Sequence, residues 1–107
     1  MMRAFVLRVA LLMPAAAVPQ PARPAEHIVV ITGMRFGAAP ANVKAGDTIV
    51  WVNRDVVPHT ASARDRSFDV TLQPGQSARV TVRRAGTVAF YCRFHPAMQG
   101  LLRVAAR

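Results

Sequence analysis

Short apolar or alternating runs, each followed by a turn signal, recur along this chain and constrain its fold more than any other feature. Each run has the length of a strand and is too short for a typical helix. No segment shows a helical period. The pattern predicts an all-β chain that forms a Greek-key β-sandwich. The six runs cover residues 28–31, 48–52, 68–72, 78–82, 87–92 and 101–104.

Segments with Gly or Pro separate these runs and supply the turns that a sandwich needs. They lie at residues 44–47, 73–76 and 84–87. In the second segment, Pro74 fixes φ and Gly75 tolerates a positive φ. We therefore predict a type II turn there.

The amino end has the composition of a secretory signal. Arg3 and Arg8 supply positive charge, residues 9–13 are apolar, and residues 14–17 are proline and small alanines. The apolar stretch is too short to span a bilayer. We predict export to the periplasm, and the alternative is an uncleaved amphipathic membrane anchor.

The predicted signal peptide covers residues 1–22, with cleavage after Ala17 or Ala22. Residues 23–107 then form one domain, because a chain of 107 residues leaves no room for a second core. We expect this domain to be a monomer without stable membrane insertion.

The predicted domain is strongly basic. Once Arg3 and Arg8 are set aside, twelve Lys and Arg oppose five Asp and Glu, a net charge of +7. The basic residues are spread along the sequence, with only Arg83 and Arg84 adjacent, which does not suit a nucleic-acid-binding tail. We expect an acidic protein partner or an anionic envelope, and the alternative is a basic surface that serves solubility alone.

The chain has one cysteine, Cys92, near its carboxyl end. Exported proteins meet an oxidising compartment in which thiols pair, yet Cys92 has no partner in this chain. His95 and Met98 follow it at spacings of three, and His59 precedes it. One thiolate, two imidazoles and one thioether are the donor set of a blue copper site. We therefore predict that these four residues bind one copper ion per chain, which would also protect the thiol.

Alternation along residues 87–92 indicates where the cysteine points. Val88, Phe90 and Cys92 share one face of the predicted strand, because successive side chains of a strand point to opposite faces. Cys92 would lie at the end of the apolar interior. The loop beyond it could then bring His95 and Met98 back to the same point.

Other readings of these residues fit less well. Structural zinc prefers more thiolates, and methionine is a poor ligand for zinc. A Cys–His nucleophile pair lacks an orienting Asn or Asp and an oxyanion motif, so we expect no enzyme. A structural sandwich without metal would leave the spacing of three a coincidence. We interpret His27 as an exposed polar residue at a strand start and Met34 as a core residue.

Several stretches of the chain resemble the cupredoxins, the small blue copper proteins. The resemblance is greatest to amicyanin, with pseudoazurin and plastocyanin as relatives. The two-residue gaps on either side of His95 are the amicyanin-like trait. The matching stretches are residues 34–36, 43–53, 58–60, 74–75, 85–92 and 95–100.

This resemblance implies a role for each predicted ligand. His59, Cys92 and His95 would form the trigonal copper plane, with Met98 as the long axial contact and His95 as the exit for the electron. It implies a one-electron carrier with transient redox protein partners. A periplasmic copper-delivery protein with the same ligands is the alternative.

Two positions depart from the family pattern. Arg93 stands where the family often has a Ser or Thr that links the two ligand loops through the residue after the first His, here Thr60. We expect that link to be altered, and such links tune metal affinity and potential. Phe94 stands where amicyanin commonly has Pro, which bears on the rigidity of the loop.

Overall fold

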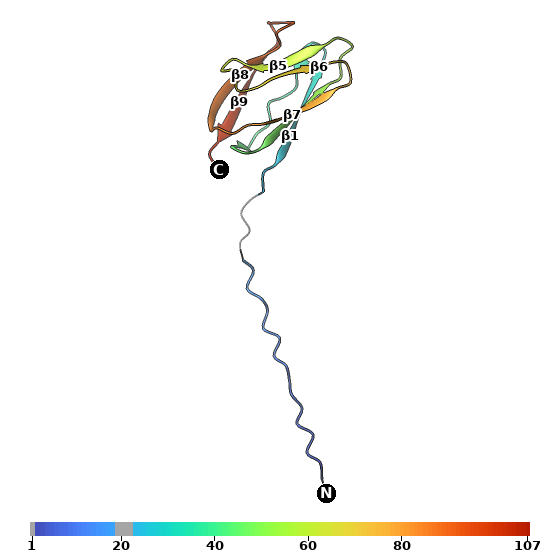
Figure 1. The fold of residues 1–107 in the computed structure, drawn as a ribbon, viewed down its shortest axis with the longest axis vertical. Coiled ribbons are helices and arrows are strands. Elements are labelled where there is room, and N and C mark those ends of the chain that lie inside the picture. The colour runs from blue at the N-terminus through green and yellow to red at the C-terminus, as the bar shows by residue number, and fades with distance from the viewer. Residues whose placement is uncertain (1, 19–22) are drawn as a thin grey trace.

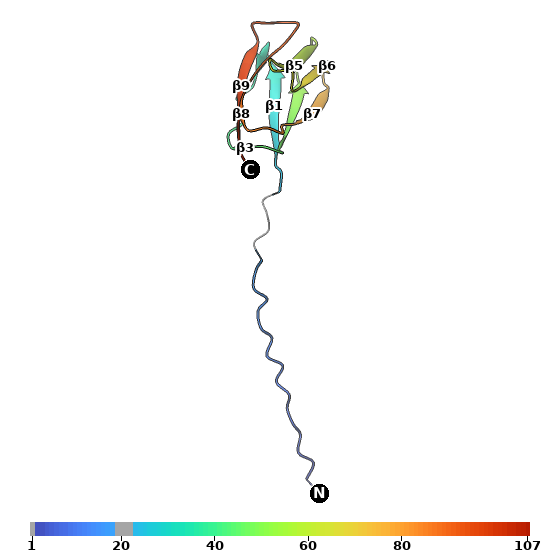
Figure 2. The same ribbon diagram turned by 60° about the vertical axis from the view of Figure 1, so that its left-hand side comes forward.

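A computed structural model describes residues 2–18 and 23–107 of the chain. The second range folds into two sheets packed face to face, and the described residues form no helix (Figures 1 and 2). One sheet has the strand order β2-β1-β4-β7 and the other β3-β9-β8-β5-β6. The predicted all-β sandwich is therefore confirmed. The strands are β1 (Glu26–Thr32), β2 (Arg35–Phe36), β3 (Val43–Lys44), β4 (Thr48–Asn53), β5 (His59–Ala63), β6 (Asp69–Leu72), β7 (Ser77–Thr81), β8 (Gly86–Tyr91) and β9 (Gln99–Ala105).

All six predicted runs are strands, within two residues at each end. The sequence pattern did not indicate β2, β3 or β5. The first two are only two residues long. All five residues of β5 are buried, and they are small or polar, so the strand shows neither an alternating nor an apolar pattern. This strand matters most for the site, because it begins with His59.

Two tight turns place glycine where φ is positive. Gly75 has φ of 81°, and the N–H of Gln76 donates to the carbonyl of Gln73 over 2.9 Å, which confirms the predicted type II turn. Between β1 and β2, Gly33 and Met34 both have φ near 60°, the mark of a type I′ hairpin turn. This turn directs Met34 toward the end of the sandwich where β1 finishes.

An aromatic cluster fills the space between the sheets. The ring centroids of Trp51 and Phe90 lie 5.0 Å apart, and Phe36 packs 4.9 Å from Phe90 in an edge-to-face arrangement. Phe68 lies 5.7 Å from Trp51 on the other side. Gly100 of β9 lies under Phe90, where a Cβ atom would come within 2.2 Å of the ring. The cluster supports the inner face of β8, which leads directly to the cysteine.

A buried carboxylate ties the two sheets together at the end where β1 and β4 begin. Asp47 is 1% exposed and accepts hydrogen bonds of 2.9 Å from the N–H groups of Ala25 and Lys44. Its other contacts are the Nε2 atom of His27, at 2.9 Å, and the guanidinium of Arg107. The hydrogen bond with His27 is the main reason that the pKa of Asp47 lies far below its usual value. The expectation that His27 is a plain exposed residue is therefore wrong, because its ring is largely buried against this carboxylate.

Residues 2–18 precede β1 in the chain and form no strand or helix. Their apolar side chains are exposed, Phe5 and Leu12 among them. No helix among the described residues is long and apolar enough to cross a membrane. The predicted cleavage position after Ala22 lies outside the described residues.

Candidate metal centre

Cys92 and His59 meet at the end of the sandwich opposite the Asp47 cluster. Cys92 follows the last residue of β8, and His59 is the first residue of β5. Both side chains are fully buried, and the Sγ atom of Cys92 lies 3.7 Å from the Nδ1 atom of His59. Phe90 and Cys92 both face inward, as the alternation along β8 predicted.

A carboxylate orients the His59 ring. The Oδ2 atom of Asp55 lies 2.7 Å from Nε2 of His59, and the same carboxylate accepts the N–H groups of Gly33 at 2.6 Å and Met34 at 2.9 Å. The N–H of Met34 is the main reason that the pKa of Asp55 lies below its usual value of 3.8, so the carboxylate is an acceptor at neutral pH. The hydrogen of the neutral His59 ring therefore belongs on Nε2. This leaves a lone pair on Nδ1, the atom that faces Cys92.

Asn53, at the end of β4, shapes the loop that leads to His59. Its Nδ2 atom donates to the carbonyls of Val57 at 2.9 Å and Leu72 at 3.0 Å, and its Oδ1 atom accepts the N–H of Asp55 at 2.9 Å. The side chain is fully buried, so water does not compete for these bonds. The amide thus fixes the turn that positions both Asp55 and His59.

Hydrogen-bond donors surround the sulfur of Cys92. Burial raises the pKa of this thiol, but the N–H of Thr60, at 3.3 Å from Sγ, opposes it together with the N–H groups of Phe94 and His95. The net result is a pKa below the ordinary thiol value. The site therefore favours a thiolate, which is the form that binds metals.

The loop after Cys92 closes back on itself. The N–H of Cys92 donates to the carbonyl of Met98 at 3.1 Å, and the N–H of Met98 donates to the carbonyl of His95 at 2.8 Å. The ring of His95 lies next to that of His59, with 5.2 Å between their centroids. Met98 is 6% exposed. The fold thus gathers all four predicted ligands at one end of the sandwich.

This donor set fits a soft metal ion. A thiolate sulfur at about 2.3 Å and an imidazole nitrogen at about 2.1 Å from one metal lie roughly 3.6–3.8 Å apart for tetrahedral to trigonal angles. The separation of 3.7 Å between Cys92 and His59 falls in that range. Within residues 2–18 and 23–107, no three His, Cys, Asp or Glu side chains form a ready-made metal cluster.

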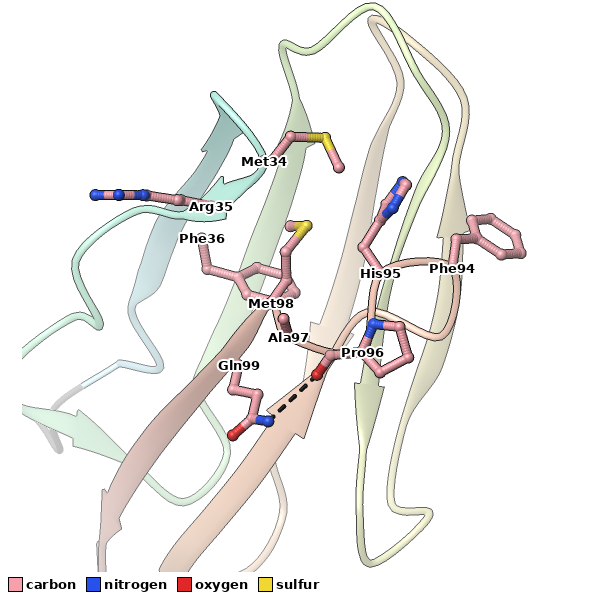
Figure 3. A pocket seen from close by; sticks show the side chains of 9 residues that line it. All are labelled: Met34, Arg35, Phe36, Phe94, His95, Pro96, Ala97, Met98 and Gln99. Atoms are coloured by element: carbon pink, nitrogen blue, oxygen red, sulfur yellow. Dashed lines mark hydrogen bonds between the residues drawn. The ribbon is translucent and has the colours of Figure 1, made fainter.

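A hollow of about 630 Å³ opens beside these residues. Figure 3 shows the side chains of Met34, His95 and Met98 around it, and Phe94 lines it from the far side of the loop. Met34 is 40% exposed, so the expectation that it belongs to the core is wrong. The positive φ of the hairpin turn places it at the rim instead.

The link between the two ligand loops survives the substitution at position 93. The backbone N–H of Arg93 donates to Oγ1 of Thr60 over 2.8 Å, so the bond needs no hydroxyl at position 93. The Arg93 side chain turns outward and contacts Asp69 of β6. Sequence reasoning missed Asp55 and Asp69. The spacing of four between Asp55 and His59 was a signal for the first, whereas Asp69 lies 24 residues from Arg93 and gave none.

Comparison with known proteins places the chain in a family. The sequence profile of the Cupredoxin-like domain matches residues 3–104. Amicyanin from Paracoccus versutus is 31% identical over 84 residues, covering 72% of this chain and 64% of the amicyanin. Amicyanin from Paracoccus denitrificans is 30% identical over 79 residues, covering 68% of this chain and 60% of that protein. The chain thus aligns with slightly less than two thirds of either relative.

A solved structure agrees with the sequence matches. The Cu(I) form of an amicyanin variant, with one methionine replaced by alanine, superposes with a TM-score of 0.62 at 29% identity. The match covers 72% of this chain and 79% of that one. The profile, the relatives and the solved structure agree, and the chain belongs to the cupredoxin family, with amicyanin among its similar members.

Proposed function

We propose that this protein is a type 1 copper protein that carries single electrons between partner proteins and is not an enzyme. The observation that carries the proposal is the buried pair of Cys92 Sγ and His59 Nδ1, 3.7 Å apart. Asp55 holds the proton of His59 on the far nitrogen, and N–H groups favour the thiolate. Both donors are thus prepared for a soft metal ion.

His59, Cys92, His95 and Met98 would hold one copper ion per chain. When bound, copper supplies one-electron chemistry by alternating between Cu(I) and Cu(II). The chain's own contribution is to keep the donors in place. Hydrogen bonds fix Cys92 from Thr60 and from the closed loop, while Asp55 fixes His59. Little movement of these ligands then accompanies each transfer, and burial of the thiolate excludes water.

The surface around His95 suits brief contact with a redox partner. His95 lines the hollow together with Pro96 and Ala97, and Phe94 is 48% exposed beside them. A small apolar patch of this kind is typical of short-lived electron-transfer encounters. We propose that the electron leaves at His95 and that partners with an acidic rim dock there.

The visible spectrum tests the copper proposal. Copper-loaded protein should absorb strongly in the visible by sulfur-to-copper charge transfer, at one copper per chain. Cys92→Ser should abolish the band, whereas Met34→Leu should keep it, because Met34 is not among the proposed ligands. A colourless copper-loaded wild type, or a full band in Cys92→Ser, would overturn the proposal.

Copper delivery is the second candidate, and the exposed thioether of Met34 favours it. Met34 lies at the mouth of the hollow that also holds Met98 and His95, where a second soft donor could receive Cu(I) (Figure 3). If delivery is the function, Met34→Leu should slow the transfer of Cu(I) to a chelator at least tenfold. An unchanged transfer rate would leave the electron carrier as the function.

We also propose that the chain is exported and works in the periplasm. The basic and apolar leader supports a signal peptide over residues 1–22 and a domain over 23–107. Mass spectrometry of the periplasmic protein should give a mature start at Val18 or Arg23. Recovery of the full chain in the membrane fraction would instead support an uncleaved anchor.

A further inference from the structure

We propose that Asp69 is a positioning residue for the cysteine loop and acts through the hydroxyls of Ser62 and Thr60. This inference deepens the proposed copper function and rests on it. Asp69 starts β6, two strands away from β8 in the same sheet. A relay of hydrogen bonds nevertheless connects its carboxylate to the backbone beside Cys92.

The donors and acceptors of this relay can run in only one direction. An ionised carboxylate carries no hydrogen, so the Ser62 hydroxyl donates to Asp69 over 2.7 Å. The single hydrogen of Ser62 is then used, so the Thr60 hydroxyl donates to Ser62 over 2.9 Å. The oxygen of Thr60 is left as an acceptor, and it takes the N–H of Arg93 over 2.8 Å.

Because the two hydroxyls of the relay are buried, they have no water molecules as alternative hydrogen-bond partners. Thr60 is fully buried and Ser62 is 3% exposed, so water does not replace their partners. The hydrogen bond from Ser62 is also the main reason that the pKa of Asp69 lies below its usual value, with Arg93 contributing. Asp69 is therefore charged at neutral pH and fixes the direction of both hydroxyls.

Arg93 closes the relay into a ring. Its Nε atom lies 3.2 Å from Oδ1 of Asp69, the oxygen that also accepts from Ser62. The backbone N–H of Arg93 thus contacts Thr60 at one end of the relay, and its side chain contacts Asp69 at the other. The Arg93 side chain thus attaches the loop to β6, in addition to the bond of its backbone N–H to Thr60 of β5.

The relay holds the thiolate because Thr60 contacts both the side chain of Cys92 and the backbone N–H of the next residue. Its N–H donates to Cys92 Sγ at 3.3 Å, and its Oγ1 accepts the N–H of Arg93. Thr60 also follows His59 directly. A shift of its hydroxyl would therefore change the relation between the sulfur and the His59 ring.

Hydrogen exchange in the metal-free full chain tests the relay without copper. Thr60→Val removes the hydroxyl but keeps the shape of the side chain, whereas Thr60→Ser keeps the hydroxyl. The Arg93 amide should exchange at least tenfold faster in Thr60→Val and stay within twofold of wild type in Thr60→Ser. Asp69→Ala should accelerate the same amide, although Asp69 does not touch it. The matched control is Asp65→Ala, which removes an exposed carboxylate in the turn between β5 and β6 that accepts a hydrogen bond from the N–H of Ser67.

The copper-loaded protein gives a second readout that loss of stability alone would not produce. The reduction potential of Asp69→Ala should rise, because the carboxylate favours the more positive Cu(II) form, and its visible band should shift. Asp65→Ala should change both less. If Asp69→Ala matches Asp65→Ala in exchange and in potential, or Thr60→Val matches Thr60→Ser, the relay does not position the loop. A wild type that binds no copper would overturn the proposed function, while the exchange result would still decide the relay.

Discussion

At the scale of single residues, Asp55 is the side chain on which the orientation of His59 depends. It joins the hairpin turn between β1 and β2 to the Nε2 atom of His59. Carboxylates that hold the second nitrogen of a metal-binding histidine typically contribute 10- to 100-fold in metal affinity. We expect Asp55→Ala to lower copper affinity by about that factor, measured by competition with a chelator. An affinity equal to that of Asp65→Ala would contradict this role.

Asp47 is the residue that should make the fold sensitive to acid. Its pKa is lowered in the folded state, so its contribution to stability is complete above the ordinary value of 3.8 and is lost as the pH falls further. In metal-free protein, the free energy of unfolding should therefore fall more steeply between pH 5 and pH 2 in the wild type than in Asp47→Asn. Urea unfolding at each pH measures this. Equal slopes in the two proteins would show that Asp47 does not control the acid response.

At the scale of strands, the packing of β9 against β8 depends on the missing side chain at Gly100. A Cβ atom there would lie 2.2 Å from the Phe90 ring, which the surrounding aromatic cluster holds in place. We expect Gly100→Ala to destabilise the protein by about 3 kcal/mol, as overpacking of a core does. Denaturant unfolding gives the value. In a Phe90→Leu background the same change should cost less, and an equal cost would point to the backbone instead.

The strands also show what the sequence could and could not predict. Short apolar or alternating runs identified β1, β4 and β8, and period-two alternation along β8 identified the inward direction of Cys92. These patterns missed β5, which is buried on both faces. The four candidate ligands could be recognised from residue type and spacing. Asp69 could not, because its role depends on hydrogen bonds that exist only once the loops have met, and the only signal for Asp55 was its spacing of four from His59.

At the scale of the whole molecule, the basic residues are spread along the sequence but are not spread evenly over the fold. Six basic residues gather at the end of the sandwich away from His95, where β3 pairs with the end of β9 and where β7 leads into β8. Glu26, Asp47 and Asp65 are the acidic residues at the same end. At the end with the ligand loops, Arg35, Arg54 and Arg93 face Asp55 and Asp69. The six are Lys44, Arg66, Arg83, Arg84, Arg103 and Arg107.

This separation predicts which charges steer a partner to His95. A strand of seven residues, such as β9, spans about 23 Å, which is more than twice the Debye length of about 10 Å at 0.1 M salt. We therefore expect Arg35→Gln with Arg54→Gln to slow electron transfer to an acidic partner several-fold at low salt. The charge-matched pair Arg83→Gln with Arg84→Gln should leave the rate within twofold. Stopped-flow kinetics would test this, and equal slowing by both pairs would show that steering acts on total charge.

The interior position of β9 sets the order of events when the chain is made. This strand follows the cysteine loop in the sequence, yet it lies between β3 and β8 in its sheet. The N–H of Cys92 reaches the Met98 carbonyl only when β8 and β9 pair. A nascent chain that has delivered Cys92 but not β9 therefore carries an open, unprotected thiol. If copper binds as proposed, it binds only after synthesis has passed residue 105, when β9 can pair with β8 and close the loop over the thiol.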